Sequence, residues 1–187
     1  MADGCNSRRG SGVATVFSGL IGADFASLPP AVQAVHGGLG PLTMTGRADI
    51  ELAPGLIAHW ATALVGLPAA GRDVPVTITF DRRADAEIWD RRFAARRYRS
   101  RVTAGQRLLV ERLGPFDNLF RLRATPAGLR WHLVGFRLLG IGLPDFLRPR
   151  CDACEYADGE GRFVFDIAMD LPGVGRIIRY CGWLVPA

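Results

Sequence analysis

The stretch Val74-Pro75-Val76-Thr77-Ile78-Thr79-Phe80 decides the fold class, because apolar and polar side chains alternate along it with a period of two. Successive side chains of a β-strand point to opposite faces of the sheet. Strict alternation therefore predicts a strand with one buried face and one face in water. From this stretch onward, apolar and polar residues continue to alternate with the period of two that is typical of β-strands.

Downstream of this stretch the same pattern recurs between short turns. Seven further strands are predicted at 86–94, 97–103, 106–113, 118–125, 129–139, 161–170 and 176–185, with glycine or proline in most of the connections. About eight strands at this spacing predict an antiparallel meander that curls into a barrel or half-barrel. A longer break separates Gly140 from Tyr156, and within it residues 143–147 predict one helical turn that plugs an end.

Upstream of the stretch the pattern is helical. One helix is predicted from about Ala14 to Ile21, and a second begins with Pro29 and Pro30 and ends at Gly37. A short extended piece covers Leu42 to Leu52, and a third helix runs from Pro54 to Gly66. The fold class is therefore mainly β (α+β), with residues 1–15 as a flexible tail and residues 16–187 as a single β-rich domain.

Composition narrows the class of protein. The chain has 187 residues, of which 49% are hydrophobic and 22% charged, values typical of a globular domain. The apolar run at 57–67 is too short to span a bilayer, so no transmembrane segment is predicted.

The apolar stretch 13–23 is diluted by Ser18 and two glycines and precedes no cleavage site. It predicts a helix rather than a signal peptide, and we expect a cytoplasmic location.

The four cysteines, Cys5, Cys151, Cys154 and Cys181, include a single C-x-x-C pair. A structural zinc site needs four ligands, and no second pair with suitable spacing is present. The simplest interpretation is that the cysteines are ordinary thiols in a reducing compartment. A metal-binding role and a redox role remain as alternatives. No metal and no cofactor are predicted, and none of the common nucleotide-binding or hydrolase motifs occurs.

The net charge of +5 comes with arginine as the only basic residue apart from the histidines, and eight arginines fall between residues 82 and 101. Arg97, Arg99 and Arg101 share one strand face. This face is either solvated and paired with neighbouring acids, or a docking surface for an acidic partner. Period two directs the nearby aromatics Trp89, Phe93 and Tyr98 into the core. Because single-strand binders expose such rings for base stacking, we expect no specific nucleic-acid binding.

Six side chains are the candidates for a site inside the sheet. Carboxylates flanked by apolar strand residues can line an interior cavity, and histidine, arginine and tyrosine can complete such a site. The predicted ligand-binding residues are His36, Glu111, Arg137, Glu155, Asp166 and Tyr180. An enzyme would need at least two of them within hydrogen-bond reach in one pocket.

Several short segments, taken in order, resemble the bacterial family called domain of unknown function 4166. They are residues 17–36, Gly46 with Arg47, residues 111–115, Leu143 with Pro144, Pro149 with Glu155 and Tyr156, and the ending from Phe165 to Leu184. The resemblance covers residues 16 to 185, and the Cys151–Cys154 pair is not part of it. It implies a stand-alone domain or a C-terminal attachment to saccharopine-dehydrogenase-like oxidoreductases, with no catalytic residues to transfer.

Three hypotheses about function follow. The first is a non-catalytic domain that binds a hydrophobic or lipid-like small molecule inside the curled sheet, because the late strands carry apolar residues on both faces. The second is an interaction module that docks to an oxidoreductase partner through the arginine-rich face. The third is an enzyme whose pocket carries no recognised signature.

Overall fold

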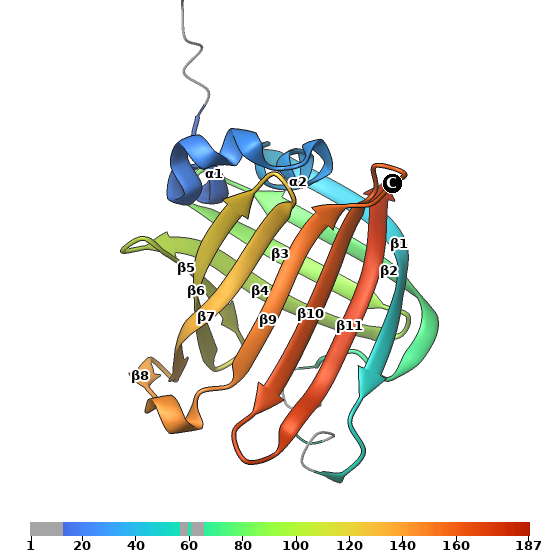
Figure 1. Ribbon diagram of the computed structural model, residues 1–187, viewed down its shortest axis with the longest axis vertical. Helices are drawn as coiled ribbons and strands as arrows, with labels where there is room; N and C mark the ends of the chain where they lie inside the picture. The colour runs from blue at the N-terminus through green and yellow to red at the C-terminus, as the bar shows by residue number, and fades with distance from the viewer. Residues whose placement is uncertain (1–12, 57–59, 61–65) are drawn as a thin grey trace, which may run out of the picture.

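The computed structural model describes residues 13–56, 60 and 66–187, and its main feature is a closed antiparallel β-barrel with short helices across one end (Figure 1). The strands are β1 (Gly40–Leu52), β2 (Gly71–Arg82), β3 (Ala86–Phe93), β4 (Arg96–Gly105), β5 (Leu108–Leu113), β6 (Phe116–Thr125), β7 (Gly128–Leu138), β8 (Ile141–Gly142), β9 (Arg150–Ala157), β10 (Phe163–Leu171) and β11 (Gly175–Pro186).

The strands follow one another around the barrel in chain order. β6 pairs with β7, β7 pairs with β9, and β1 pairs with β11 to close the ring. β8 is a two-residue strand that pairs with β7 alone and stands outside the ring. Among the described residues the barrel therefore has ten strands plus one extra. The predicted antiparallel barrel is confirmed, and the predicted number of about eight strands is too low.

Two strands account for the difference in number. The piece predicted as short and extended, Leu42 to Leu52, is the thirteen-residue strand β1. The predicted break after Gly140 contains β9, which the sequence pattern concealed. Alternation along β9 places Cys151, Ala153 and Glu155 inside the barrel, so its buried face is small or polar and lacks the apolar period of the other strands.

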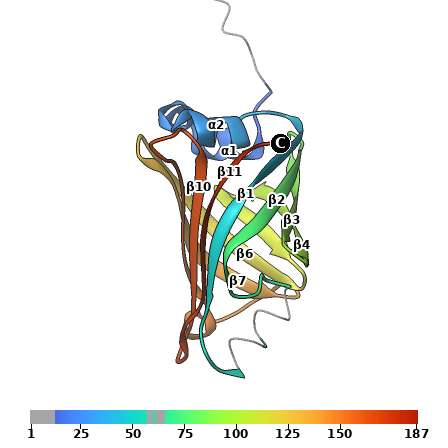
Figure 2. The same ribbon diagram turned by 90° about the vertical axis from the view of Figure 1, so that its right-hand side faces the viewer.

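The predicted N-terminal helices are present as α1 (Val16–Ile21) and α2 (Pro30–His36), joined by a 3-10 helix η1 (Gly22–Ser27). They lie across one end of the barrel (Figures 1 and 2). Thr15 begins α1 with a capping box, and the buried side chains of Phe17 and Val32 face the barrel. The predicted turn at 143–147 is the 3-10 helix η2 (Asp145–Leu147). The third predicted helix falls largely on 57–59 and 61–65, and the tail on 1–12, outside the described residues.

Arg82 fastens the helical cap to the barrel. It is the last residue of β2, and its guanidinium donates hydrogen bonds to the carbonyl oxygens of Gly40 at 3.1 Å, Ala34 at 3.0 Å and Val35 at 2.8 Å. The carbonyls at a helix C-terminus lack intrahelical partners, and a cation is favoured there. Arg82 therefore satisfies the end of α2 and fixes its position over the barrel.

No helix in the described part of the chain is long and apolar enough to cross a membrane.

The contact between the first and last strands depends on two glycines. A Cβ added to Gly46 would lie 1.8 Å from the carbonyl oxygen of Trp183, and one added to Gly182 would lie 2.4 Å from that of Arg47. Gly46 pairs with Leu184 and Gly182 with Ala48, so the two glycines lie two positions apart in the β1–β11 register. Sheets that curve into barrels need such sites at tight bends, because a side chain would hold the backbones apart.

Gly46→Ala and Gly182→Ala are expected to lower the free energy of unfolding by about 1–3 kcal/mol each, because the added methyl group must displace backbone. Gly159→Ala is the control, since a Cβ there meets nothing within 4 Å, and it should stay within about 0.5 kcal/mol of wild type. Urea unfolding followed by tryptophan fluorescence measures all three. If Gly46→Ala and Gly159→Ala had equal stability, the close approach at this pairing would be wrong.

Candidate functional site

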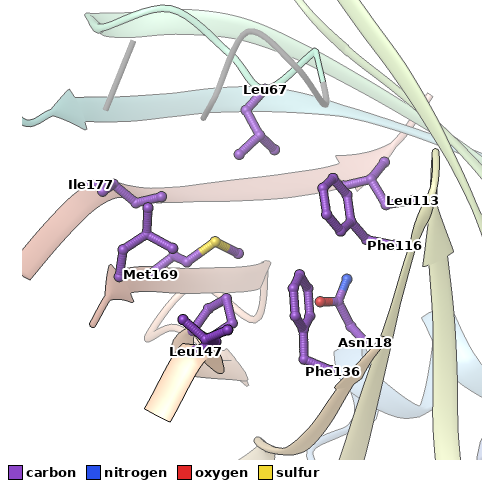
Figure 3. Close-up of a pocket in the computed structure, with 10 residues that line it drawn as sticks. Leu67, Leu113, Phe116, Asn118, Phe136, Leu147, Met169 and Ile177 are labelled. Carbon is purple, nitrogen blue, oxygen red and sulfur yellow. The ribbon is translucent and has the colours of Figure 1, made fainter. Parts of the chain in front are cut away.

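The interior of the barrel contains a cavity of about 190 Å³ at the end away from the helical cap. The side chains that line it come from β5, β6 and β7 and from β10 and β11, with three more from outside the strands, and they converge on one space (Figure 3). The lining is apolar except for Asn118 and consists of Leu67, Leu113, Phe116, Asn118, Phe136, Leu147, Pro149, Met169, Leu171 and Ile177.

Two smaller cavities continue from the first toward the helical cap. The second, of about 70 Å³, shares Leu67, Leu113, Asn118 and Met169 with the first. The third cavity has a volume of about 40 Å³ and lies beside the second. Five residues line both of them: Trp89, Arg91, Glu155, Ile167 and Tyr180. The shared walls place the three spaces next to one another along one path through the barrel, which is apolar at its outer end and has its charged side chains further inside.

Arg91 is the central polar group of this path. Its Nη1 donates a hydrogen bond to Ser100 Oγ at 2.7 Å, and its Nη2 donates to Glu111 Oε1 at 2.9 Å. Ser100 Oγ in turn donates to the same Glu111 oxygen at 2.7 Å. The guanidinium also lies over the ring of Trp89, 4.7 Å from its centroid, where a cation is attracted to the π face. Arg91 is therefore neutralised and held in one orientation.

Two tyrosines complete the polar wall around Arg91. Burial raises the pKa of Tyr180 well above its usual value and also raises the pKa of Tyr98, so both keep their protons. Their hydroxyls interact with each other, and Tyr98 Oη has no other hydrogen-bond partner among the described residues. The Tyr98 hydroxyl can both donate and accept, so it has hydrogen-bonding capacity left for a molecule in the cavity.

A second buried polar group lies beneath the helical cap. His36 is fully buried, is stacked on Phe17, and forms a hydrogen bond between its Nε2 and Glu155 Oε2 at 2.7 Å. Trp89 Nε1 donates to Glu87 Oε2 at 2.7 Å. Burial raises the pKa of Glu87, although the charges of His36 and Arg82 and the bond from Trp89 oppose the shift. Within the described chain, His36 Nδ1 and Glu87 Oε1 have no hydrogen-bond partner.

Four of the six predicted site residues meet in the interior. Glu111, Glu155 and Tyr180 line the second cavity, and His36 lies directly behind Glu155. His36 and Glu155 thus form a buried hydrogen-bonded pair at the inner end of the cavity wall.

The other two predicted residues, Arg137 and Asp166, lie on the outside of the barrel, which corrects their assignment to the interior. Asp166 alternates with the inward-facing Phe165 and Ile167 and accepts a hydrogen bond from Arg179 Nη2 at 2.8 Å. Arg137 is exposed and stands opposite Asp117 on the neighbouring strand. For both residues, the alternation of side chains along the strand decides whether the side chain points into the barrel or outward, and the apolar character of the sequence neighbours does not.

Sequence reasoning missed Arg91, Asn118 and Glu87 as interior polar groups, and it placed Tyr98 in the core without assigning it to the site. A signal was present for Arg91, because it lies between Trp89 and Phe93 in the same period-two series, and both rings were predicted to face inward. This signal was overlooked because Arg91 was grouped with the arginines of the outer face. The predicted inward placement of Trp89, Phe93 and Tyr98 is confirmed by their burial.

The predicted interaction residues Arg97, Arg99 and Arg101 all face water, on the outer side of β4. Two of them share one acid, since Arg97 Nε donates to Asp90 Oδ1 at 2.8 Å and Arg99 Nη2 donates to Asp90 Oδ2 at 2.8 Å. The hydrogen bond from Arg97, with that from Arg99, lowers the pKa of Asp90 to about 2 against the opposing effect of burial. One carboxylate therefore offsets part of the charge of these three arginines.

The C-x-x-C pair is divided between the two sides of the barrel. Residues three apart on a strand point to opposite faces, so Cys151 lines the second cavity while Cys154 faces outward beside Asp166. Burial raises the pKa of Cys151 to about 12, which keeps it a thiol. The described residues contain no group of three or more histidine, cysteine or acidic side chains that could hold a metal ion.

A family model described as Domain of unknown function (DUF4166) matches residues 28–184, which is nearly the whole described barrel with α2. No curated protein and no solved structure shows a significant match to the chain.

Glu111→Leu is expected to lower the free energy of unfolding by about 3–5 kcal/mol, because it leaves the charge of Arg91 buried without its partner. The double variant Arg91→Met, Glu111→Leu should recover most of this loss. Asp170→Asn, which breaks an exposed pair with Arg176, is the control and should cost less than about 1 kcal/mol. Urea unfolding measures the cycle, and strictly additive losses would contradict the coupling of Arg91 with Glu111.

Glu87→Gln is expected to change how stability depends on pH. Because the folded chain holds the Glu87 proton to higher pH than the unfolded chain, this group stabilises the fold below its ordinary pKa of 4.5 and loses that contribution as pH rises through the folded value. The variant should match wild type in acid and become the more stable of the two toward neutral pH. Urea unfolding across a pH series tests this, with the exposed Glu160→Gln as control; a constant difference at all pH values would refute it.

Proposed function

The chain belongs to the DUF4166 family, and we propose that it is a non-catalytic domain that binds a small, uncharged amphipathic molecule inside the barrel. The observation that carries the proposal is the cavity of about 190 Å³ with its apolar lining, which leads inward to polar groups. Binding sites for small molecules have this composition, with apolar walls and a few polar groups that orient the ligand.

The number of strands supports an interior that can hold a ligand. Barrel diameter grows with strand number, and eight strands already leave room for side chains or one small ligand. Ten strands leave more, even with Trp89, Trp131 and Phe163 pointing inward. Met169 stands between the first and second cavities, and its flexible thioether can shift to let a ligand extend inward.

The polar groups indicate the charge of the ligand. Arg91 is already paired with Glu111, so a ligand carboxylate placed beside it would itself be a buried negative charge without a partner. Tyr98 Oη and the amide of Asn118 remain as hydrogen-bonding groups along the path. An apolar body with a hydroxyl or carbonyl end matches this wall better than a fatty acid.

Leu113→Trp is expected to weaken binding of the neutral fluorophore prodan at least tenfold, because the indole fills the space between the first and second cavities. Leu108→Trp is the matched control, since alternation on the same strand points it outward, and it should bind like wild type. Titration followed by the blue shift of prodan emission measures both. In competition, 1-octanol should displace prodan at least tenfold more effectively than octanoate.

Native mass spectrometry of the purified chain, with solvent extraction, provides an independent check. Absence of any saturable prodan binding together with absence of a co-purifying molecule would refute the proposal. A bound molecule recovered in chemically altered form, with the change abolished by Glu155→Gln, would instead favour an enzyme that uses the His36–Glu155 pair.

A further inference from the structure

One end of the barrel displays large apolar side chains to solvent. β8, η2 and the β10–β11 turn lie at this end, opposite α1 and α2 (Figure 1). Leu139 is 77% exposed, Ile141 71% and Phe146 72%. Together with the partly exposed Leu147 and Val174 they form what we call the apolar rim. Large apolar side chains gathered on one exposed surface mark an interaction site.

Leu139 has a strained backbone conformation and also exposes its apolar side chain to water. It lies in the two-residue turn between β7 and β8 with a φ of 52°, followed by Gly140 with a φ of 82°. Such turns favour asparagine and glycine, because a side chain in the left-handed region is strained. The fold therefore retains a strained and exposed leucine where asparagine would serve the turn better, which indicates a role outside folding.

The apolar rim is continuous with the first cavity. Phe146 and Leu147 are neighbours in η2, and Leu147 lines the cavity together with Pro149 and Leu171. Phe146 and Val174 border a surface hollow between η2 and the β10–β11 turn, which also includes Leu171. A surface that touched the rim would therefore meet the apolar entrance of the cavity.

The charges around the apolar rim are mainly positive. Arg148 Nη1 lies 2.8 Å from Asp145 Oδ1, and Arg176 Nε lies 2.7 Å from Asp170 Oδ1, so these two acids are paired. Arg137 and Arg150 are exposed at the same end and form no ion pair with any described residue within 4.0 Å, although Asp117 and Asp170 stand opposite them on neighbouring strands. The rim thus combines projecting apolar side chains with an excess of exposed arginine.

We propose that the apolar rim docks onto the surface of an anionic lipid bilayer, with Leu139, Ile141 and Phe146 entering the boundary between headgroups and acyl chains. The proposal rests on the proposed function, since the docked membrane is the source or destination of the molecule in the cavity. Arginine near an anionic leaflet is attracted to it, and exposed leucine and phenylalanine partition into the interface. Side chains that project from a turn and from a one-turn helix are better placed to enter a lipid layer than to match a flat protein surface.

The test is co-sedimentation with phosphatidylcholine vesicles that contain 30% phosphatidylglycerol, compared with pure phosphatidylcholine. The wild-type chain should bind the anionic vesicles and not the neutral ones. Leu139→Asn should lower the partition coefficient at least fivefold while raising the melting temperature, because it relieves the strained turn. Phe146→Ser should lower the partition coefficient at least tenfold, and Arg137→Gln with Arg150→Gln about 25-fold, at about fivefold per arginine.

Leu39→Ser is the matched control, because Leu39 is 45% exposed next to the helical cap, at the opposite end of the barrel. It should bind vesicles like wild type. Binding of prodan in the absence of vesicles should be unchanged in Leu139→Asn, which separates failure of the rim from failure of the cavity. Equal sedimentation with neutral and anionic vesicles, or equal partitioning of Leu139→Asn and wild type, would overturn the proposal. Rim-dependent capture of a protein without vesicle binding would overturn it as well.

Discussion

The pairing of the first strand with the last is the constraint on which the rest of the structure depends. β1 and β11 lie side by side over nine residue pairs, from Met44 with Pro186 to Leu52 with Ile178. Their union leaves the ring without a free edge, so the backbone polar groups of the ten strands are satisfied within the sheet. Gly46 and Gly182 make it possible, because no side chain separates the backbones at that point. The segments around these glycines are among those that resemble the family.

Once the ring is closed, alternation along each strand decides which side chains share the interior. The inward series brings Arg91, Glu111 and Tyr180 together from strands that are far apart in the chain. Buried charges are expensive, so they persist only where partners are provided, as Glu111 and Ser100 are for Arg91. The polar wall of the cavity is thus a direct consequence of register, and a shift by one residue would expose it to water.

The two ends of the barrel have opposite characters. At one end Arg82, His36 and Phe17 fix the helices by buried hydrogen bonds and ring stacking, and this end is closed by well-packed side chains. At the other end the first cavity meets exposed apolar residues and a strained turn. The cap end also carries a cost, because His36 Nδ1 and Glu87 Oε1 are buried there without a hydrogen-bond partner among the described residues.

The sequence by itself determined the antiparallel character, the inward direction of Trp89, Phe93 and Tyr98, the two N-terminal helices and the family, because periodicity and local turn residues are properties of short segments. It also led to four interior residues, His36, Glu111, Glu155 and Tyr180. Only the tertiary structure decided that β9 is a strand, since its inward residues are small or polar, and that Asp166 and Arg137 face outward. The cavities, the pairing of Arg91 with Glu111 and the apolar rim arise from contacts between distant strands. Such contacts depend on closure and register, which no local pattern in the chain encodes.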